Sequence, residues 1–145
     1  MKLLEVVMVI SLALLVAIMA YLPFAGYRKS QALSGATENT LSLLSKARTD
    51  TVSSVNNNQY GIHLASSSLT LFAGSSYPGT TVQTVTLPSV VVVSDTSLFG
   101  NDVNIIFDRV TGTTAAYGTI TLQQVGDATK QRIIKVEATG LSYVQ

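Results

Sequence analysis

Residues 3–27 read LLEVVMVISLALLVAIMAYLPFAGY, and the interpretation of the whole chain begins from this stretch. Between Val6 and Tyr27 no side chain is charged, which is a run of 22 residues. As a helix rising about 1.5 Å per residue, the run would be roughly 33 Å long, close to the ~30 Å hydrocarbon core of a bilayer. The stretch therefore predicts one long apolar helix at the start of the chain.

A cleaved secretory signal is one alternative for this segment. Such a signal combines a basic start with an apolar stretch of about 7–15 residues and a cleavage site between small residues. Lys2 is basic, but the apolar run is too long, and it ends in Tyr21, Leu22, Pro23 and Phe24 without such a site. The hydrophobicity alone favours a plain membrane anchor instead.

Glu5 does not fit a plain anchor, because it places a carboxylate at the head of the apolar run. An ionised acid at membrane depth costs several kcal/mol unless it is paired, so it is a functional candidate by default. The helix dipole favours a negative charge in the first turn by only about 0.3–1 kcal/mol. Glu5 therefore needs a cation, either its own N-terminal amine or that of a neighbouring subunit, unless it is an interfacial side chain that reaches water.

The segment LLEVVMVI, residues 3–10, resembles the processed N-terminus of type IV pilins and type II secretion pseudopilins. In that family a prepilin peptidase removes a short basic leader and leaves a glutamate as the fifth residue. Because Glu5 is fifth here, we interpret the chain as a mature subunit. The resemblance implies N-terminal methylation and pairing of Glu5 with the Met1 amine of an adjacent subunit. The residues expected in the filament core are Leu4, Val6, Val9, Ile10, Leu14 and Ile18.

The segment departs from the family pattern at Met1, where Phe is common, and at Lys2, where a small polar residue is usual. A proline near the end of the segment is typical, and Pro23 is followed closely by Gly26. Proline removes a helix hydrogen bond and clashes with the carbonyl four residues earlier, here that of Met19. We therefore predict a kink or a locally unwound stretch over residues 19–26.

Helical periodicity resumes after Pro23 and then gives way to strand patterns. Apolar or small residues form one stripe at Leu33, Ala36, Leu41, Leu44, Ala47, Thr51 and Val55. Three asparagines at 56–58 predict the end of a helix of about 50 residues. Short β-branched runs between Gly and Pro residues then predict strands over 60–64, 69–72, 82–87, 90–93, 103–107, 118–123, 133–137 and 141–144.

These patterns predict an α+β protein with a long helix packed on an antiparallel sheet. We divide it into an apolar half-helix (1–27), an amphipathic half-helix (28–56) and a β-rich globular part (57–145). The globular part resembles the H-type minor pseudopilins and their transformation-linked relatives through Ala47-Arg48, Gln59-Tyr60-Gly61-Ile62, Ile106-Phe107-Asp108, Gly112 and Gly140. Some of those relatives bind DNA through an arginine-rich tail, but here residues 140–145 read GLSYVQ, so nucleic-acid binding is not expected.

Composition gives little support to catalysis or metal binding. The net charge is +1, there is no cysteine, and His63 is the single histidine. A lone histidine in a predicted strand is far more often a packing residue than a catalytic one, and no EF-hand spacing is present. We expect no catalytic residue, no metal and no cofactor.

The main hypothesis is therefore a structural subunit of a type IV pilus-like filament. It would be single-pass in the cytoplasmic membrane before assembly and lie in an extracellular filament afterwards. Its expected partners are copies of itself, other pilins, an assembly platform and a prepilin peptidase. Two alternatives remain: a minor pseudopilin at the tip of a type II secretion pseudopilus, and a single-pass anchored binding module or enzyme.

Overall fold

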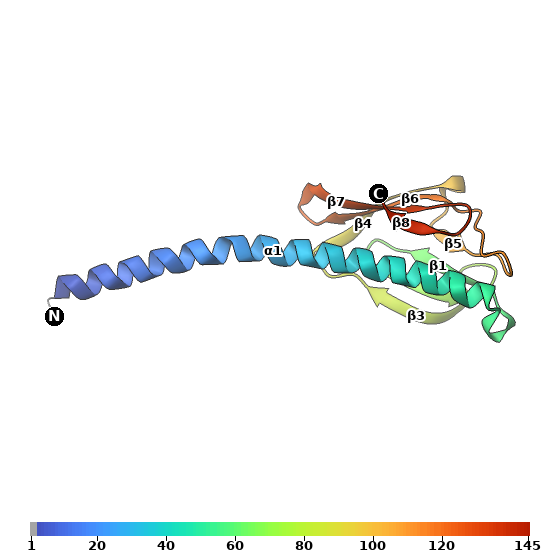
Figure 1. The fold of residues 1–145 in the computed structure, drawn as a ribbon, viewed down its shortest axis with the longest axis horizontal. Helices are drawn as coiled ribbons and strands as arrows, with labels where there is room; N and C mark the ends of the chain where they lie inside the picture. The colour runs from blue at the N-terminus through green and yellow to red at the C-terminus, as the bar shows by residue number, and fades with distance from the viewer. Residues whose placement is uncertain (1–2) are drawn as a thin grey trace.

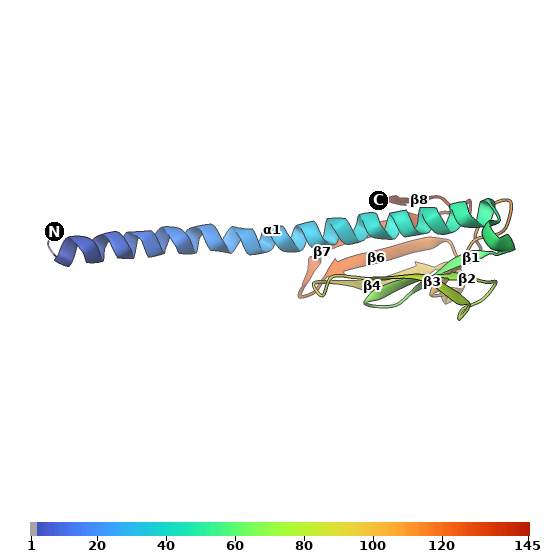
Figure 2. The same cartoon turned by 90° about the horizontal axis from the view of Figure 1, so that it is seen from below.

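A computed structural model describes the backbone of residues 3–145 and their side chains except those of residues 20–25. One helix, α1 (Leu3–Val52), runs the length of the molecule, and two four-stranded antiparallel sheets pack along its C-terminal half (Figure 1). Seen at 90° to that view, the strands other than β8 lie on one side of the helix, and the N-terminal half of the helix extends beyond the sheets (Figure 2). The α+β prediction is confirmed.

The C-terminal half of α1 packs through one stripe. Five predicted stripe residues are buried, namely Leu33, Ala36, Leu44, Ala47 and Thr51. Leu41 is only partly buried, and Val55 lies beyond the helix in the 3-10 turn η1 (Val55–Asn57) and is 38% exposed. The stripe also includes Leu43 and two threonines that were not predicted, Thr37 and Thr40.

Buried threonines are tolerated in α1 because their hydroxyls bond back to the helix. Thr37, Thr40 and Thr51 each donate to the carbonyl four residues earlier, at 2.8 Å. A buried hydroxyl without a partner would cost about 1–3 kcal/mol. Thr51 also accepts the backbone N–H of Tyr60 at 3.0 Å, which connects the end of the helix to the first strand.

We predicted either a kink or an unwound stretch over residues 19–26, and the structure contradicts the unwound stretch. The helix is continuous from Leu3 to Val52 and therefore passes through Pro23 without a break. One proline removes one hydrogen bond, while the turns before and after it keep theirs. The ribbon curves gently along its length (Figure 1). The side chain of Pro23 itself lies outside the described residues.

The strands divide into two sheets. The first sheet has the order β3-β2-β1-β5, built from β1 (Tyr60–Leu64), β2 (Ser68–Ala73), β3 (Thr80–Thr86) and β5 (Asn104–Ile106). The second sheet has the order β4-β6-β7-β8, built from β4 (Val91–Leu98), β6 (Gly118–Gln124), β7 (Asp127–Val136) and β8 (Ser142–Val144). A 3-10 turn, η2 (Phe99–Asn101), follows β4.

Alternation along the strands separates an inner from an outer face. In the first sheet Ile62, Leu71 and Ile105 are paired neighbours, and each is at most 1% exposed. In the second sheet Ile120 pairs with Ile134, and both are fully buried. These side chains form one hydrophobic core with the α1 stripe, as expected for sheets that are apolar on one face only.

Candidate assembly surface

The N-terminal part of α1 has no protein cover in the single chain. Its large apolar side chains between Leu3 and Met19 are between 43% and 85% exposed. All six residues predicted for a filament core, Leu4, Val6, Val9, Ile10, Leu14 and Ile18, are among them. We call residues 3–19 the apolar rod.

The rod is apolar on every side. Val6, Val7, Met8 and Val9 follow one another at steps of about 100° and so cover the whole circumference of the helix. Each of them is more than 40% exposed. A helix that is hydrophobic all round belongs inside a large assembly or a membrane.

Among the described residues, which leave out the side chains of residues 20–25 in this run, no helix meets the length and hydropathy needed to cross a membrane.

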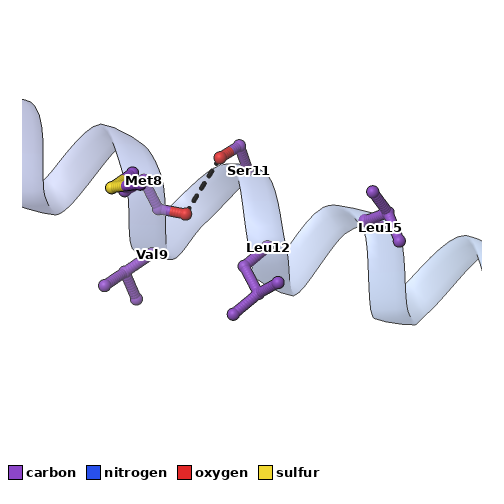
Figure 3. Close-up of a pocket in the computed structure, with 5 residues that line it drawn as sticks. All are labelled: Met8, Val9, Ser11, Leu12 and Leu15. Carbon is purple, nitrogen blue, oxygen red and sulfur yellow. Dashed lines mark hydrogen bonds between the residues drawn. The ribbon is translucent and has the colours of Figure 1, made fainter.

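A shallow depression marks one side of the rod. Met8, Val9, Ser11, Leu12 and Leu15 line it, with the small Ser11 between larger neighbours (Figure 3). The Ser11 hydroxyl donates to the Met8 carbonyl at 2.9 Å, so this hydroxyl is not an unsatisfied donor in the depression. Small residues of this kind let helices approach closely where both are apolar.

Glu5 lies in the first turn of α1 and is exposed. It forms no ion pair within the described part of the chain, where the salt bridge found joins Lys130 and Asp127. Met1 and Lys2 lie outside the described residues. The pairing of Glu5 with a Met1 amine therefore stays a prediction.

Gly26 lies on an open part of the helix. A Cβ added there would meet no atom within 4 Å. Packing within one chain therefore does not require a glycine at this position. The predicted role of Pro23 and Gly26 as a flexible point also stays a prediction.

A second cluster joins residues far apart in the sequence. The Nε–H of Arg48 donates to the Gly112 carbonyl at 3.3 Å, and Gly140 packs against both. Gly112 and Gly140 have φ of +68° and +79°, a region that favours glycine. A Cβ on Gly140 would overlap the Gly112 carbonyl. The structure thus brings together three of the residues that carried the resemblance to H-type pseudopilins.

A third polar feature is the hydrogen-bonded carboxyl of Asp127. The Thr129 hydroxyl and backbone N–H donate to Asp127 and lower the pKa of this exposed carboxyl, with a smaller contribution from Lys130. Within residues 3–145 as described, no group of three or more His, Cys, Asp and Glu side chains is placed to hold a metal ion.

Sequence reasoning did not find two aromatic stacks, one of them on a half-buried histidine. His63 stacks on Tyr77 with ring centroids 3.9 Å apart, and Phe99 stacks on Tyr117 at 5.0 Å. The partners in each stack are 14 and 18 residues apart and share no helix or strand. No periodicity relates them, and the one available signal was a glycine directly after Phe99 and after Tyr117.

No family model and no curated protein matches the chain significantly in sequence. Among solved structures it is similar to the type IV minor pilin FimU of Pseudomonas aeruginosa strain PAO1, seen in two crystal forms. One form aligns with a TM-score of 0.60 and 16% identity over 78% of this chain and 92% of FimU. The other gives 0.63 and 15% over 82% and 92%. The chain therefore has a type IV pilin-like fold.

Proposed function

We propose that this chain is a structural, non-enzymatic subunit of a type IV pilus-like extracellular filament, in which the apolar rods of many copies bundle in the core. The uncovered apolar surface of residues 3–19 is the observation that carries the proposal. The pilin-like fold supports it, because it leaves this half of the helix free of the sheets.

The size of the uncovered surface explains why it needs a partner. Fully burying a Leu, Val, Ile or Met side chain stabilises by about 1.5–3 kcal/mol. The thirteen such side chains of the rod are between 43% and 85% exposed, so covering them would contribute on the order of 10–25 kcal/mol. That is as large as the net stability of a typical domain, about 5–15 kcal/mol.

Before assembly, we propose that lipid covers the rod, with the chain single-pass in the cytoplasmic membrane. Lipid tails are as apolar as leucine, so a bundle gains little hydrophobic free energy over a bilayer. Close packing and polar contacts must then decide where the rods meet. The depression at Ser11 allows close packing, and Glu5 supplies a polar contact.

Glu5 would set the register of the bundle. Its carboxylate is the one acid of the described rod, and a desolvated acid needs a counter-charge. The Met1 amine of the adjacent subunit supplies that charge in this proposal. Each rod is then fixed lengthwise against its neighbour, which the apolar side chains alone do not achieve.

The test compares Glu5→Gln and Glu5→Ala with Glu38→Gln, a matched control that removes an exposed acid from the packed half of the same helix. Electron microscopy of sheared surface fibres and immunoblots of the membrane fraction are the two measurements. We expect both Glu5 variants to lose filaments while membrane-inserted subunit stays at the wild-type amount, and Glu38→Gln to assemble normally. Abundant filaments from Glu5→Ala would contradict the register role.

A second candidate is a minor subunit at the tip of such a filament, including a secretion pseudopilus. It is favoured by one observation, that FimU is itself a minor pilin. Quantitative mass spectrometry of sheared fibres separates the two candidates. A major subunit would be the bulk protein of the fibre, whereas a minor one would be a trace component whose deletion lowers the number of fibres.

A further inference from the structure

A small surface pocket lies where β5 meets the turn η2, far from the apolar rod. Its volume is about 280 Å³. That is slightly below the roughly 300–1,000 Å³ of pockets for drug-sized ligands, so it suits one small ring. The lining residues are Phe99, Gly100, Asp102, Asn104, Ile106, Ala115 and Ala116.

One wall of the pocket is a supported aromatic ring. Phe99 is 64% exposed. Tyr117 stacks on it with the ring planes 8° apart, and the Phe99 backbone N–H donates to the Tyr117 carbonyl at 2.8 Å. A flat apolar face is thus held in place next to the pocket. Such a face suits a ligand that is itself flat and apolar on one side.

The polar side of the pocket is fixed by a chain of hydrogen bonds. Asp102 Oδ1 accepts from the backbone N–H and the Nδ2 amide of Asn104, at 2.9 and 2.8 Å. Asn104 Oδ1 lies 2.8 Å from His63 Nδ1. Because an amide oxygen can only accept a hydrogen bond, the histidine tautomer that fits this contact carries its proton on Nδ1. His63 is covered in turn by Tyr77. Asn104 and Asp102 therefore present their polar groups in one set orientation.

Polar side chains extend from the pocket across the first sheet. Pairing places Thr84, Thr70, His63 and Asn104 in one row across all four strands of the first sheet. The strand neighbours of Thr70 and His63 on both sides are buried, as is Ile105 next to Asn104, so the row lies on the outer face. The row carries hydroxyl and amide groups beside an imidazole that Tyr77 covers, and it contains no Lys or Arg. With the carboxylate of Asp102 beside it, the surface does not favour phosphates or other anions.

We propose that this pocket, with the adjoining polar row, binds a neutral saccharide. A pyranose ring has an apolar C–H face that stacks on an aromatic ring, and a rim of hydroxyls that donate and accept hydrogen bonds. Phe99 meets the first requirement, and Asp102 and Asn104 meet the second. The inference goes beyond filament assembly and concerns the outer surface of the globular part.

The test uses the full-length chain in a detergent without a sugar headgroup, because glucosides and maltosides would compete. The probes are lactose, maltose and diacetylchitobiose at about 10 mM, followed by saturation-transfer difference NMR for dissociation constants near 1 mM. We expect transfer to the ring protons of at least one probe. Phe99→Ala removes the wall, and Ala115→Leu fills the pocket from an exposed position; each should weaken binding by about tenfold.

The control is Tyr143→Ala, which removes an exposed aromatic ring from the second sheet. It should leave binding unchanged. The proposal is overturned if no neutral saccharide receives transfer, or if Phe99→Ala and Ala115→Leu bind like the wild type while keeping its melting temperature. The binding experiment uses the detergent-solubilised single chain. A negative result would therefore say nothing about whether the chain forms filaments.

Discussion

Arg48 fixes two turns against the end of α1, and this contact depends on the absence of two side chains. Gly112 and Gly140 both have positive φ, and both approach the Arg48 side chain closely. With no cysteine in the chain, no disulfide holds these turns. The Arg48 contact, close backbone packing and the backbone hydrogen bond from Thr114 N–H to the Ala138 carbonyl hold the two turns together.

Gly140→Ala should destabilise the globular part strongly. Alanine would pay the left-handed backbone cost of about 1 kcal/mol and would also meet the Gly112 carbonyl, which adds about 1–3 kcal/mol of overpacking. Gly126→Ala is the matched control, because Gly126 has φ +84° but nothing within 4 Å of an added Cβ. Thermal unfolding should show the larger drop for Gly140→Ala. Equal drops would mean that backbone strain alone matters.

At this scale the sequence predicted residue types better than residue contacts. Glu5 could be recognised as a candidate assembly residue because its proposed role depends on the apolar residues next to it in the sequence. The glycines at 112 and 140 were read as turn residues, but their contact with Arg48 joins positions 64 and 92 residues from it. The pocket beside Phe99 was not predicted for the same reason, since its walls come from two separate segments, residues 99–106 and 115–116.

Among the elements, α1 was the easiest to predict and its midpoint the hardest. Length and periodicity gave a helix of about 50 residues, and the structure has it over Leu3–Val52. Burial was predicted from apolar character, so Thr37 and Thr40 were missed although their back-bonded hydroxyls make them acceptable in the core. The sequence left open whether the helix kinks or unwinds at Pro23, because the local cost of a proline is known but the hydrogen bonding of the two flanking helix segments is not. The structure keeps the helix continuous there.

Pro23→Ala tests whether assembly needs the helix to open near residue 23. Proline lowers the stability of a helix interior by about 3 kcal/mol or more, so alanine makes opening harder by that amount. If subunits extend there as they leave the membrane, Pro23→Ala should reduce the number of filaments severalfold by electron microscopy. Ala25→Leu, a nearby change between good helix formers, is the control. Wild-type filament numbers for Pro23→Ala would show that the continuous helix is the assembled form.

For the whole molecule, all eight strands were predicted, but their division into two sheets was not. Pairing of β1 with β5 joins residues more than 40 positions apart. The strand β4 follows β3 in the chain but pairs with β6 in the second sheet. Strand patterns fix which face is apolar and leave the choice of partner open.

The exposed rod leads to a prediction for the whole chain in solution. Full-length protein should be dispersed in detergent and should self-associate when detergent is removed, because the rod then has no other cover. Sedimentation velocity measures both states. Val9→Asp and Ile10→Lys placed together in the rod should weaken the association. A stable wild-type monomer in detergent-free buffer would contradict the assembly role.

One continuous helix joins the rod to both sheets, and this has a mechanical consequence. In a fibre under tension the force would be transmitted along the axis through contacts between neighbouring rods. The sheets are attached to α1 only from the side and would bear little of that force. Stretching would then lengthen the helix before it disturbed the β-structure, so the outer surface could keep its shape while the fibre extends.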